Sequence, residues 1–216
     1  MNLEIEVKNI RQKQLFITGI GTEVGKTVCS AVLTKYFNAD YWKPVQSGDL
    51  DFSDSQKIKE WVGKHTVCHS ETYRFQLAAS PHQSAKEEGI TIDLNEFSLP
   101  HTQNNLIAEG AGGLMVPLND HEFIIDLIEK LNIPAALVVR NYLGCINHTL
   151  LSIATLAQRK IKLEYLILNG DFPQDTERVI CKNMPSETKV IRIPDLKNIT
   201  KESIENIVKQ LEKIDS

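Results

Sequence analysis

The stretch "GIGTEVGKT" (residues 19–27) decides the fold, because it joins an apolar run to a segment with helical periodicity. The usual spelling of a phosphate-binding loop is G-x-x-x-x-G-K-[ST], and the residue five places before Gly25 is Ile20 rather than glycine. The stretch nevertheless has the context that phosphate binding requires, with a strand before it and a helix after it. We therefore predict a phosphate-binding loop that is one residue longer than usual.

The chemistry of such a loop comes from backbone N–H groups that surround phosphate oxygens at the positive end of a helix. Lys26 would reach the outer phosphates of a nucleotide, and Thr27 would hold Mg²⁺. The alternative is an ordinary glycine-bearing turn between a strand and a helix. Such a turn does not need a Lys-Thr pair at the mouth of the helix, so the sequence favours the phosphate loop.

Short apolar runs alternate with helical patterns along the chain, and the runs are nearly continuous in hydrophobicity, as in strands buried on both faces. The predicted strands are 14–18, 41–45, 105–110, 135–140, 164–168 and 189–193. The predicted helices follow the glycine loop and cover 120–132, with Asp120 as the N-cap, 147–160 and 201–214. This alternation predicts an α/β fold, a doubly wound, mainly parallel sheet flanked by helices, as in phosphate-loop NTPases. The least regular region, 48–102, should lie over one end of the sheet.

Length and charge narrow the possible functions. The chain of 216 residues suits one domain, 1–216, with residues 1–13 as a possible N-terminal extension. A net charge of −4 gives no basic surface for nucleic acid or for an anionic membrane. No apolar run is long enough to span a membrane, the N-terminus lacks the apolar part of a signal peptide, and the four cysteines are scattered. We expect a cytoplasmic protein with reduced thiols.

Three further polar motifs are predicted to lie near the phosphates. In "YWKPVQSG" (41–48), Lys43 and Ser47 end a predicted strand. In "FSDS", Asp54 could take a position in a Mg²⁺ shell, and in "AEGAGGLMVPL" Glu109 stands at a strand end before small residues. Each motif has an ordinary alternative. Lys43 and Ser47 could be a solvated lysine and a turn serine, Asp54 could belong to a helix cap, and Glu109 could be an incidental carboxylate in a glycine-rich turn. Their combination beside a phosphate loop favours the functional interpretation.

Two more motifs follow later strands. "RNYLGCINHTLL" (140–151) runs into a helix that should begin near Ile146, where free N–H groups suit a carboxylate. In "LILNGDFP", the amide of Asn169 could pair with a purine edge, although a simple turn asparagine explains it equally well in isolation. By contrast, His65, Cys68 and His69 in "KHTVCHS" lack the further ligand that zinc usually needs, and a solvated segment is the better interpretation.

Taken together, these blocks resemble the dethiobiotin synthetase family over residues 15–196. The blocks are "GTEVGKT" with its longer loop, "KPVQSG", "SPH" at 80–82, "EGAGG" and "LGCINH". The resemblance implies a ligase, an ATP- and Mg²⁺-dependent cyclo-ligase that makes dethiobiotin from 7,8-diaminononanoate and CO₂ in biotin biosynthesis. It implies that one amine becomes a carbamate, that the carbamate takes the γ-phosphoryl group, and that the second amine closes the ureido ring.

The resemblance also implies roles for individual residues. Catalysis would rest on Lys43, Thr22 and Lys26, and the Mg²⁺ ligands would be Thr27, Asp54 and Glu109. The implied ATP-binding residues are Glu23, Val24, Gly25, Lys26, Thr27, Val28, Asp54, Glu109, Gly110, Ala111, Gly112, Asn169, Gly170, Pro194, Asp195 and Leu196. The implied substrate-binding residues are Ser47, Leu143, Gly144, Cys145, Ile146 and Asn147, the last five reaching across a homodimer interface. One departure is "IRIPDL", where Arg192 replaces a residue that is often small in the family.

Two other functions fit the loop less well. An amidotransferase of cobalamin synthesis would need a glutaminase module with a catalytic cysteine, for which this chain has no room. A switch ATPase that acts through protein partners would carry a second lysine within the loop, where this chain has Gly21 and Thr22. The switch ATPase remains the alternative to the cyclo-ligase.

Overall fold

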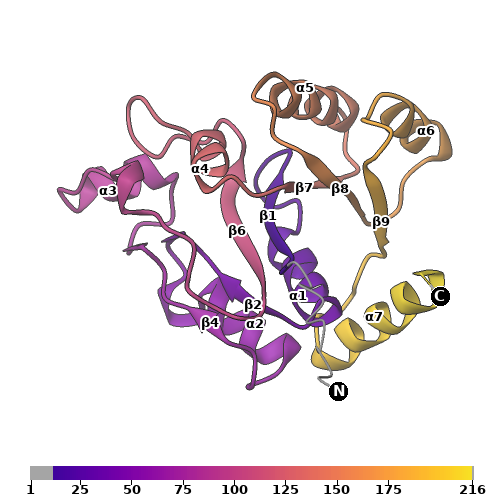
Figure 1. Ribbon diagram of the computed structural model, residues 1–216, viewed down its shortest axis with the longest axis horizontal. Coiled ribbons are helices and arrows are strands. Elements are labelled where there is room, and N and C mark those ends of the chain that lie inside the picture. Colours follow the sequence, from indigo (N-terminus) through magenta and orange to yellow (C-terminus); the bar gives the residue numbers. More distant parts are fainter. Residues whose placement is uncertain (1–11, 216) are drawn as a thin grey trace, which may run out of the picture.

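The computed structural model describes residues 12–215, so the predicted extension lies largely outside the described residues. Its main sheet has seven strands in the order β4-β2-β6-β1-β7-β8-β9, and every strand pair is parallel (Figure 1). A second, two-stranded parallel sheet pairs β3 with β5. The strands are β1 (Gln14–Gly19), β2 (Ala39–Trp42), β3 (Val45–Ser47), β4 (Cys68–His69), β5 (Tyr73–Phe75), β6 (Asn105–Gly113), β7 (Ala135–Arg140), β8 (Leu163–Asn169) and β9 (Lys189–Ile193).

Helices cover both faces of the main sheet, which confirms the predicted doubly wound α/β architecture. One face packs against α1, α2 and α7, and the other against α4, α5 and α6 (Figure 1). The helices are α1 (Lys26–Tyr36), α2 (Asp54–Val62), α3 (Pro81–Glu87), α4 (Ile124–Leu131), α5 (Cys145–Gln158), α6 (Gln174–Lys182) and α7 (Lys201–Asp215). Two short 3₁₀ helices, η1 (Leu50–Phe52) and η2 (Leu94–Glu96), lie in the irregular region. Within residues 12–215 no helix combines the length and apolar character needed to cross a membrane.

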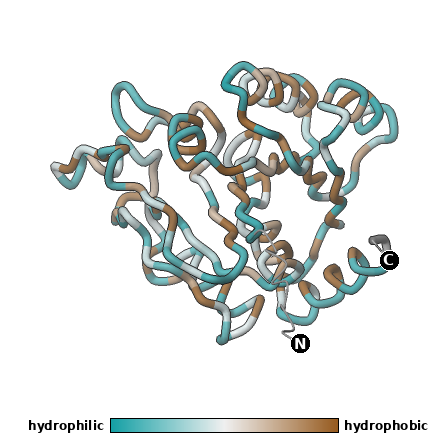
Figure 2. The backbone as a smooth tube through the Cα atoms, viewed as in Figure 1, coloured by the Kyte–Doolittle hydropathy of each residue, from teal (hydrophilic) through white to brown (hydrophobic). Residues whose placement is uncertain are grey.

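The central strands are buried on both faces because their side chains alternate between two hydrophobic layers. In β1, Phe16 packs in the layer that contains α4 and α5, while Leu15 and Ile17 pack in the layer that contains α1. Figure 2 shows the hydrophobic segments gathered along the strands at the centre of the molecule. This packing fixes the carboxyl end of β1, and therefore the start of the glycine loop, in the middle of the sheet.

Several predicted boundaries are wrong, and two of them have a clear local cause. The predicted strand 41–45 ends at Trp42, and a new strand in the second sheet begins at Val45, because Pro44 cannot donate to the ladder. The helix expected from residue 120 begins at Ile124. The side chain of Asn119 accepts hydrogen bonds from the N–H groups of His121 and Glu122, which makes a turn before the helix.

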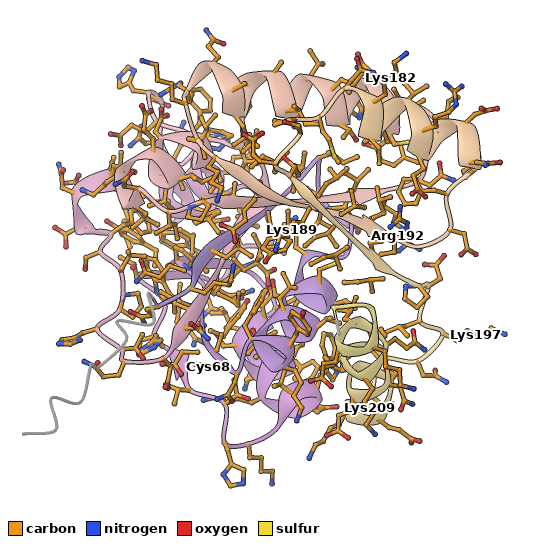
Figure 3. The ribbon with its side chains drawn as sticks, turned by 45° about the vertical axis from the view of Figure 1, so that its right-hand side comes forward. Cys68, Lys182, Lys189, Arg192, Lys197 and Lys209 are labelled. Carbon is orange, nitrogen blue, oxygen red and sulfur yellow. The ribbon has the colours of Figure 1, made fainter. Side chains whose placement is uncertain are left out.

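Charged side chains lie along β9, the strand at one edge of the main sheet. Lys189 and Arg192 project from this edge strand, and Figure 3 shows them between α6 and α7. Arg192 forms an ion pair with Glu177 of α6, so its guanidinium is directed towards that helix. Charged side chains on an edge strand disfavour pairing with another chain.

Candidate active site

The glycine loop has the geometry of a phosphate-binding loop between β1 and α1. Gly25 caps α1 with φ 86°, and a Cβ there would lie 2.1 Å from Nδ2 of Asn169, so both conformation and space require glycine. Lys26 Nζ donates to the carbonyl of Gly21 at 3.1 Å and so folds back across the loop. Burial, and then the positive charge of Lys43, together lower the pKa of Lys26 to about 8. A phosphate group would relieve both effects.

A buried carboxylate lies next to the loop, at the end of β6. The side chain of Glu109 is 1% exposed, and its Oε1 accepts hydrogen bonds from Thr27 Oγ1 at 2.9 Å and from Lys43 Nζ at 3.1 Å. Its Oε2 accepts one from the hydroxyl of Tyr41 at 2.9 Å. Burial, and then the charge of Glu109, raise the pKa of Tyr41 well above its ordinary value, so Tyr41 is a neutral donor.

Lys43 connects two carboxylates that are far apart in the sequence. Its Nζ lies 2.7 Å from Asp54 Oδ2 as well as 3.1 Å from Glu109 Oε1. Burial alone would lower the pKa of Lys43, but the charges of Glu109 and Asp54 outweigh it and raise the pKa. Burial would raise the pKa of Asp54, and the charge of Lys43 outweighs this and lowers it to about 2. Lys43 and Asp54 are therefore both charged at neutral pH.

These groups line one cavity of about 750 Å³ at the carboxyl ends of the strands. It brings together twelve predicted site residues from four parts of the chain: Thr22, Glu23, Gly25, Lys26, Thr27, Val28, Lys43, Ser47, Asp54, Glu109, Ala111 and Gly112. Val24 and Gly110 are buried beneath it, and a Cβ on Gly110 would lie 2.7 Å from the ring of Phe16. The irregular region contributes Ala78 to Pro81 to the cavity wall, as its predicted place over one end of the sheet requires.

Sequence reasoning missed several residues of this site. Lys57 and Trp61 line the cavity from α2, and Lys57 Nζ lies 3.3 Å from Asp54 Oδ1. Tyr41 does not line the cavity, but its hydroxyl donates a hydrogen bond to Glu109. Spacing carries a signal for two of them: Tyr41 alternates with Lys43 on one side of the chain, and Lys57 follows Asp54 at helical spacing.

The hydroxyl of Ser47 is the one polar group of the cavity wall that is buried without a hydrogen-bond partner among the described residues. Such an atom costs free energy unless something accepts or donates to it. A polar ligand in the cavity would supply this partner.

The donor set suits a Mg²⁺ ion. Thr27 offers a hydroxyl, and Asp54 and Glu109 offer carboxylates that already share one cation, the ammonium of Lys43. Hard oxygen ligands of this kind, together with phosphate oxygens, are what Mg²⁺ prefers. The residues present therefore fit the ion, which would neutralise charge on the nucleotide phosphates when it is bound.

The residues predicted to surround the adenine base of ATP, Asn169, Gly170 and 194–196, are not in the cavity wall. They lie near it, at or just after the ends of β8 and β9. Asn169 Nδ2 donates to the carbonyl of Val24 at 2.8 Å and thus ties the end of β8 to the phosphate loop. A Cβ on Gly170 would lie 3.1 Å from the carboxylate of Asp195, which pairs with Arg140 at 2.9 Å. Arg192 points to α6, away from this ion pair.

The segment predicted to bind the substrate carboxylate does not reach the cavity of its own chain. Gly144 has φ 105° and caps α5, which begins at Cys145, one residue before the expected start. Leu143 is fully exposed at 103%, Asn147 is exposed, and none of residues 143–147 lines the cavity.

The histidine–cysteine segment uses its polar groups for the fold. His69 Nε2 lies 3.0 Å from Asp40 Oδ2, and Cys68 Sγ donates to the carbonyl of Ser55 at 3.5 Å. Burial raises the pKa of the Cys68 thiol to about 11. Within residues 12–215 there is no group of three His, Cys, Asp or Glu side chains arranged to hold a metal.

Comparison with known proteins identifies a matching domain family and solved structures with a similar fold. The model of a family described as an AAA domain matches residues 13–203. The chain resembles a ParA family ATPase from Chlorobium tepidum with a TM-score of 0.50 and 15% identity, covering 95% of this chain and 93% of that one, which supports the fold alone.

Sequence relatives are more specific. The chain is 49% identical over 171 residues to the ATP-dependent dethiobiotin synthetase of Christiangramia forsetii, covering 79% of this chain and 82% of that protein. It is 43% identical over 194 residues to the enzyme of the same name from Cytophaga hutchinsonii, covering 89% and 93%. Identity of this size over most of both chains shows common membership, and the protein therefore belongs to the ATP-dependent dethiobiotin synthetase family.

Proposed function

We propose that this protein uses ATP and Mg²⁺ to convert 7,8-diaminononanoate and CO₂ into dethiobiotin. The observation that carries the proposal is the position of Lys43, held between Glu109 and Asp54 beside the phosphate loop. A reaction that passes a phosphoryl group between oxygen atoms needs positioning and charge neutralisation more than a covalent nucleophile. The cavity offers both, since charged and polar groups such as Lys26 and Ser47 line it.

The proposed reaction has three balanced steps. An amine of the substrate adds to CO₂ and loses a proton, which leaves a carbamate anion. A carbamate oxygen attacks the γ-phosphorus of ATP, so that a carbamic–phosphoric anhydride forms and ADP leaves. The second amine then attacks the carbamate carbon, loses a proton and expels phosphate as the ring closes. Lys43 would stabilise the carbamate and the transferred phosphoryl group, Lys26 the β- and γ-phosphates, and Thr22 would lie over the γ-phosphate.

A homodimer is part of the proposal. Leu143 at 103%, Leu151 at 58% and Met115 at 57% expose large apolar side chains, and Met115 and Leu151 share a groove of about 290 Å³ beside the glycine loop. A twofold axis through this face would cover them and make each contact twice. It would also explain why residues 143–147 do not line the cavity of their own chain, since they would serve the site of the partner.

The proposal also includes the compartment and the partners. All four cysteines are free thiols, as expected in a reducing cytoplasm. The net charge of −4 supports small-molecule substrates rather than nucleic acid or a membrane surface. The switch ATPase is not favoured, since the likeness to a ParA ATPase is one of fold only, whereas relatives at 49% and 43% identity are named synthetases.

The direct test uses the purified full chain. It is incubated with 7,8-diaminononanoate, bicarbonate, ATP and Mg²⁺, and the products are analysed by mass spectrometry. We expect dethiobiotin, ADP and phosphate in equal amounts, and no dethiobiotin when any one component is left out. Folded protein that binds ATP but yields no dethiobiotin would refute the proposal.

Asp54→Asn and Glu109→Gln should each raise the Mg²⁺ concentration needed for half-maximal activity. Each change replaces a charged oxygen ligand of the proposed ion with a neutral amide. Titration of activity with Mg²⁺ at saturating ATP measures the effect, and Asp175→Asn, an exposed carboxylate on α6 outside the cavity wall, serves as the control. An unchanged Mg²⁺ requirement in both variants would remove these carboxylates from the proposed metal site.

A further inference from the structure

Tyr41 is fully buried, and its hydroxyl contacts Glu109, one of the two carboxylates of the proposed metal site. The side chain of Tyr41 is 0% exposed and that of Glu109 is 1% exposed. The hydroxyl donates to Glu109 Oε2 at 2.9 Å, and no other described hydrogen bond reaches this oxygen. The other oxygen, Oε1, faces Thr27 and Lys43.

The parallel register of two strands creates this contact. Tyr41 of β2 lies opposite Ile107 of β6, and both side chains belong to the hydrophobic layer that contains α1. Glu109 lies two residues further along β6, and therefore on the same face of the sheet. The long side chain of Tyr41 leans forward along the strand direction, so that its hydroxyl meets the carboxylate.

The consequence is a carboxylate with two unequal oxygens. Because Oε2 is held by a neutral donor inside the core, the carboxylate cannot rotate without breaking a buried hydrogen bond. Its remaining oxygen is thereby directed towards Thr27, the other proposed ligand from the phosphate loop. Hydrogen bonds to the far side of a metal-binding group commonly set the orientation of that group.

We propose that Tyr41 is a positioning residue that orients Glu109 for Mg²⁺. The proposal rests on the proposed function, because it takes Glu109 as a ligand of the ion that accompanies ATP. Tyr41 itself touches neither nucleotide nor substrate. Its hydroxyl acts through Glu109, and removal of that hydroxyl leaves the ring in the core.

The experiment compares Tyr41→Phe with the wild-type protein by calorimetric titration of ADP at increasing Mg²⁺ concentrations, and once in EDTA. We expect the Mg²⁺ concentration for half-maximal enhancement of ADP affinity to rise about tenfold to a hundredfold, the usual effect of losing such a partner. ADP affinity in EDTA should stay the same. The matched control is Tyr165→Phe, which removes a hydroxyl from the same hydrophobic layer, where it accepts from Lys13 at 3.2 Å.

A double-mutant cycle separates positioning from a general loss of packing. In the Glu109→Gln background, Tyr41→Phe should add little to the Mg²⁺ requirement, because residues that act as a unit are not additive. If Glu109→Gln raises the requirement and Tyr41→Phe does not, the positioning role is wrong while the proposed metal site stands. If Tyr41→Phe raises it equally in both backgrounds, or if Glu109→Gln has no effect, the role of Tyr41 is likewise overturned, and the second result also removes Glu109 from the metal site.

Discussion

Lys43→Ala should lower turnover by about 10²–10³-fold, because it removes a charge contact to the groups that gain charge during phosphoryl transfer. Lys43 is 5% exposed and lies between two carboxylates, so its ammonium is held in place before any substrate arrives. Nucleotide binding should survive, since Lys26 and the backbone of the glycine loop are unchanged. The variant should also unfold more easily without Mg²⁺, because Glu109 loses its only cationic partner among the described residues.

Single-turnover formation of ADP and calorimetric binding of ATP measure the two halves of this prediction separately. The matched control is Lys35→Ala, which removes an ammonium from α1 that pairs with Glu205 at 3.5 Å, outside the cavity wall. Turnover within a few-fold of wild type in Lys43→Ala would show that its charge is not used in the reaction. Loss of ATP binding in step with turnover would assign Lys43 to the nucleotide instead.

Two inactive variants should restore activity when they are combined, if each site is shared between two chains. One variant is Lys43→Ala, and the other carries a disrupted segment 143–148, which includes the first turn of α5. In a mixed dimer, one site contains both the Lys43→Ala change and the disrupted 143–148 segment. The other site contains neither change. Random mixing of equal amounts should therefore recover about a quarter of the wild-type activity, because half of the dimers are mixed and each has one intact site.

The variants are unfolded together and refolded together, and each is also refolded alone. Mixed dimers are counted by native mass spectrometry, with a short tag on one variant to separate the masses. Activity should scale with the fraction of mixed dimers. Mixed dimers as inactive as both parents would rule out a shared site, and a monomer at all concentrations would rule out the dimer itself.

The sequence predicts best those parts of the fold whose burial is visible as a run of apolar residues. The strands at 135–140 and 189–193 are apolar enough to be read directly, and both are confirmed. The helix α6 was not predicted, because Ile180 is its only buried residue and most of its other residues are polar or charged. The elements of region 48–102 are short, and their positions depend on tertiary contacts rather than on local propensity.

The same distinction applies to the site. The glycine loop has a signal in residue type and spacing, and Lys43 stands in a block that resembles the family's, so both could be proposed from the sequence. Tyr41 is different, since an aromatic residue in a strand is normally core, and only the pairing of β2 with β6 shows what its hydroxyl meets. The expected place of Asn169 at a purine edge remains a prediction, and its bond to Val24 was not foreseen.

The strand order has a kinetic consequence. β1 lies between β6 and β7, so that Gln14 is opposite Leu106 and Phe16 is opposite Ala135. During synthesis the ribosome must therefore complete more than half of the chain before the first strand can acquire either neighbour. Non-local pairing of this kind slows folding, and the apolar β1 stays without its partners in the meantime. A nascent chain thus carries the glycine loop long before the strands on either side of β1 can support it.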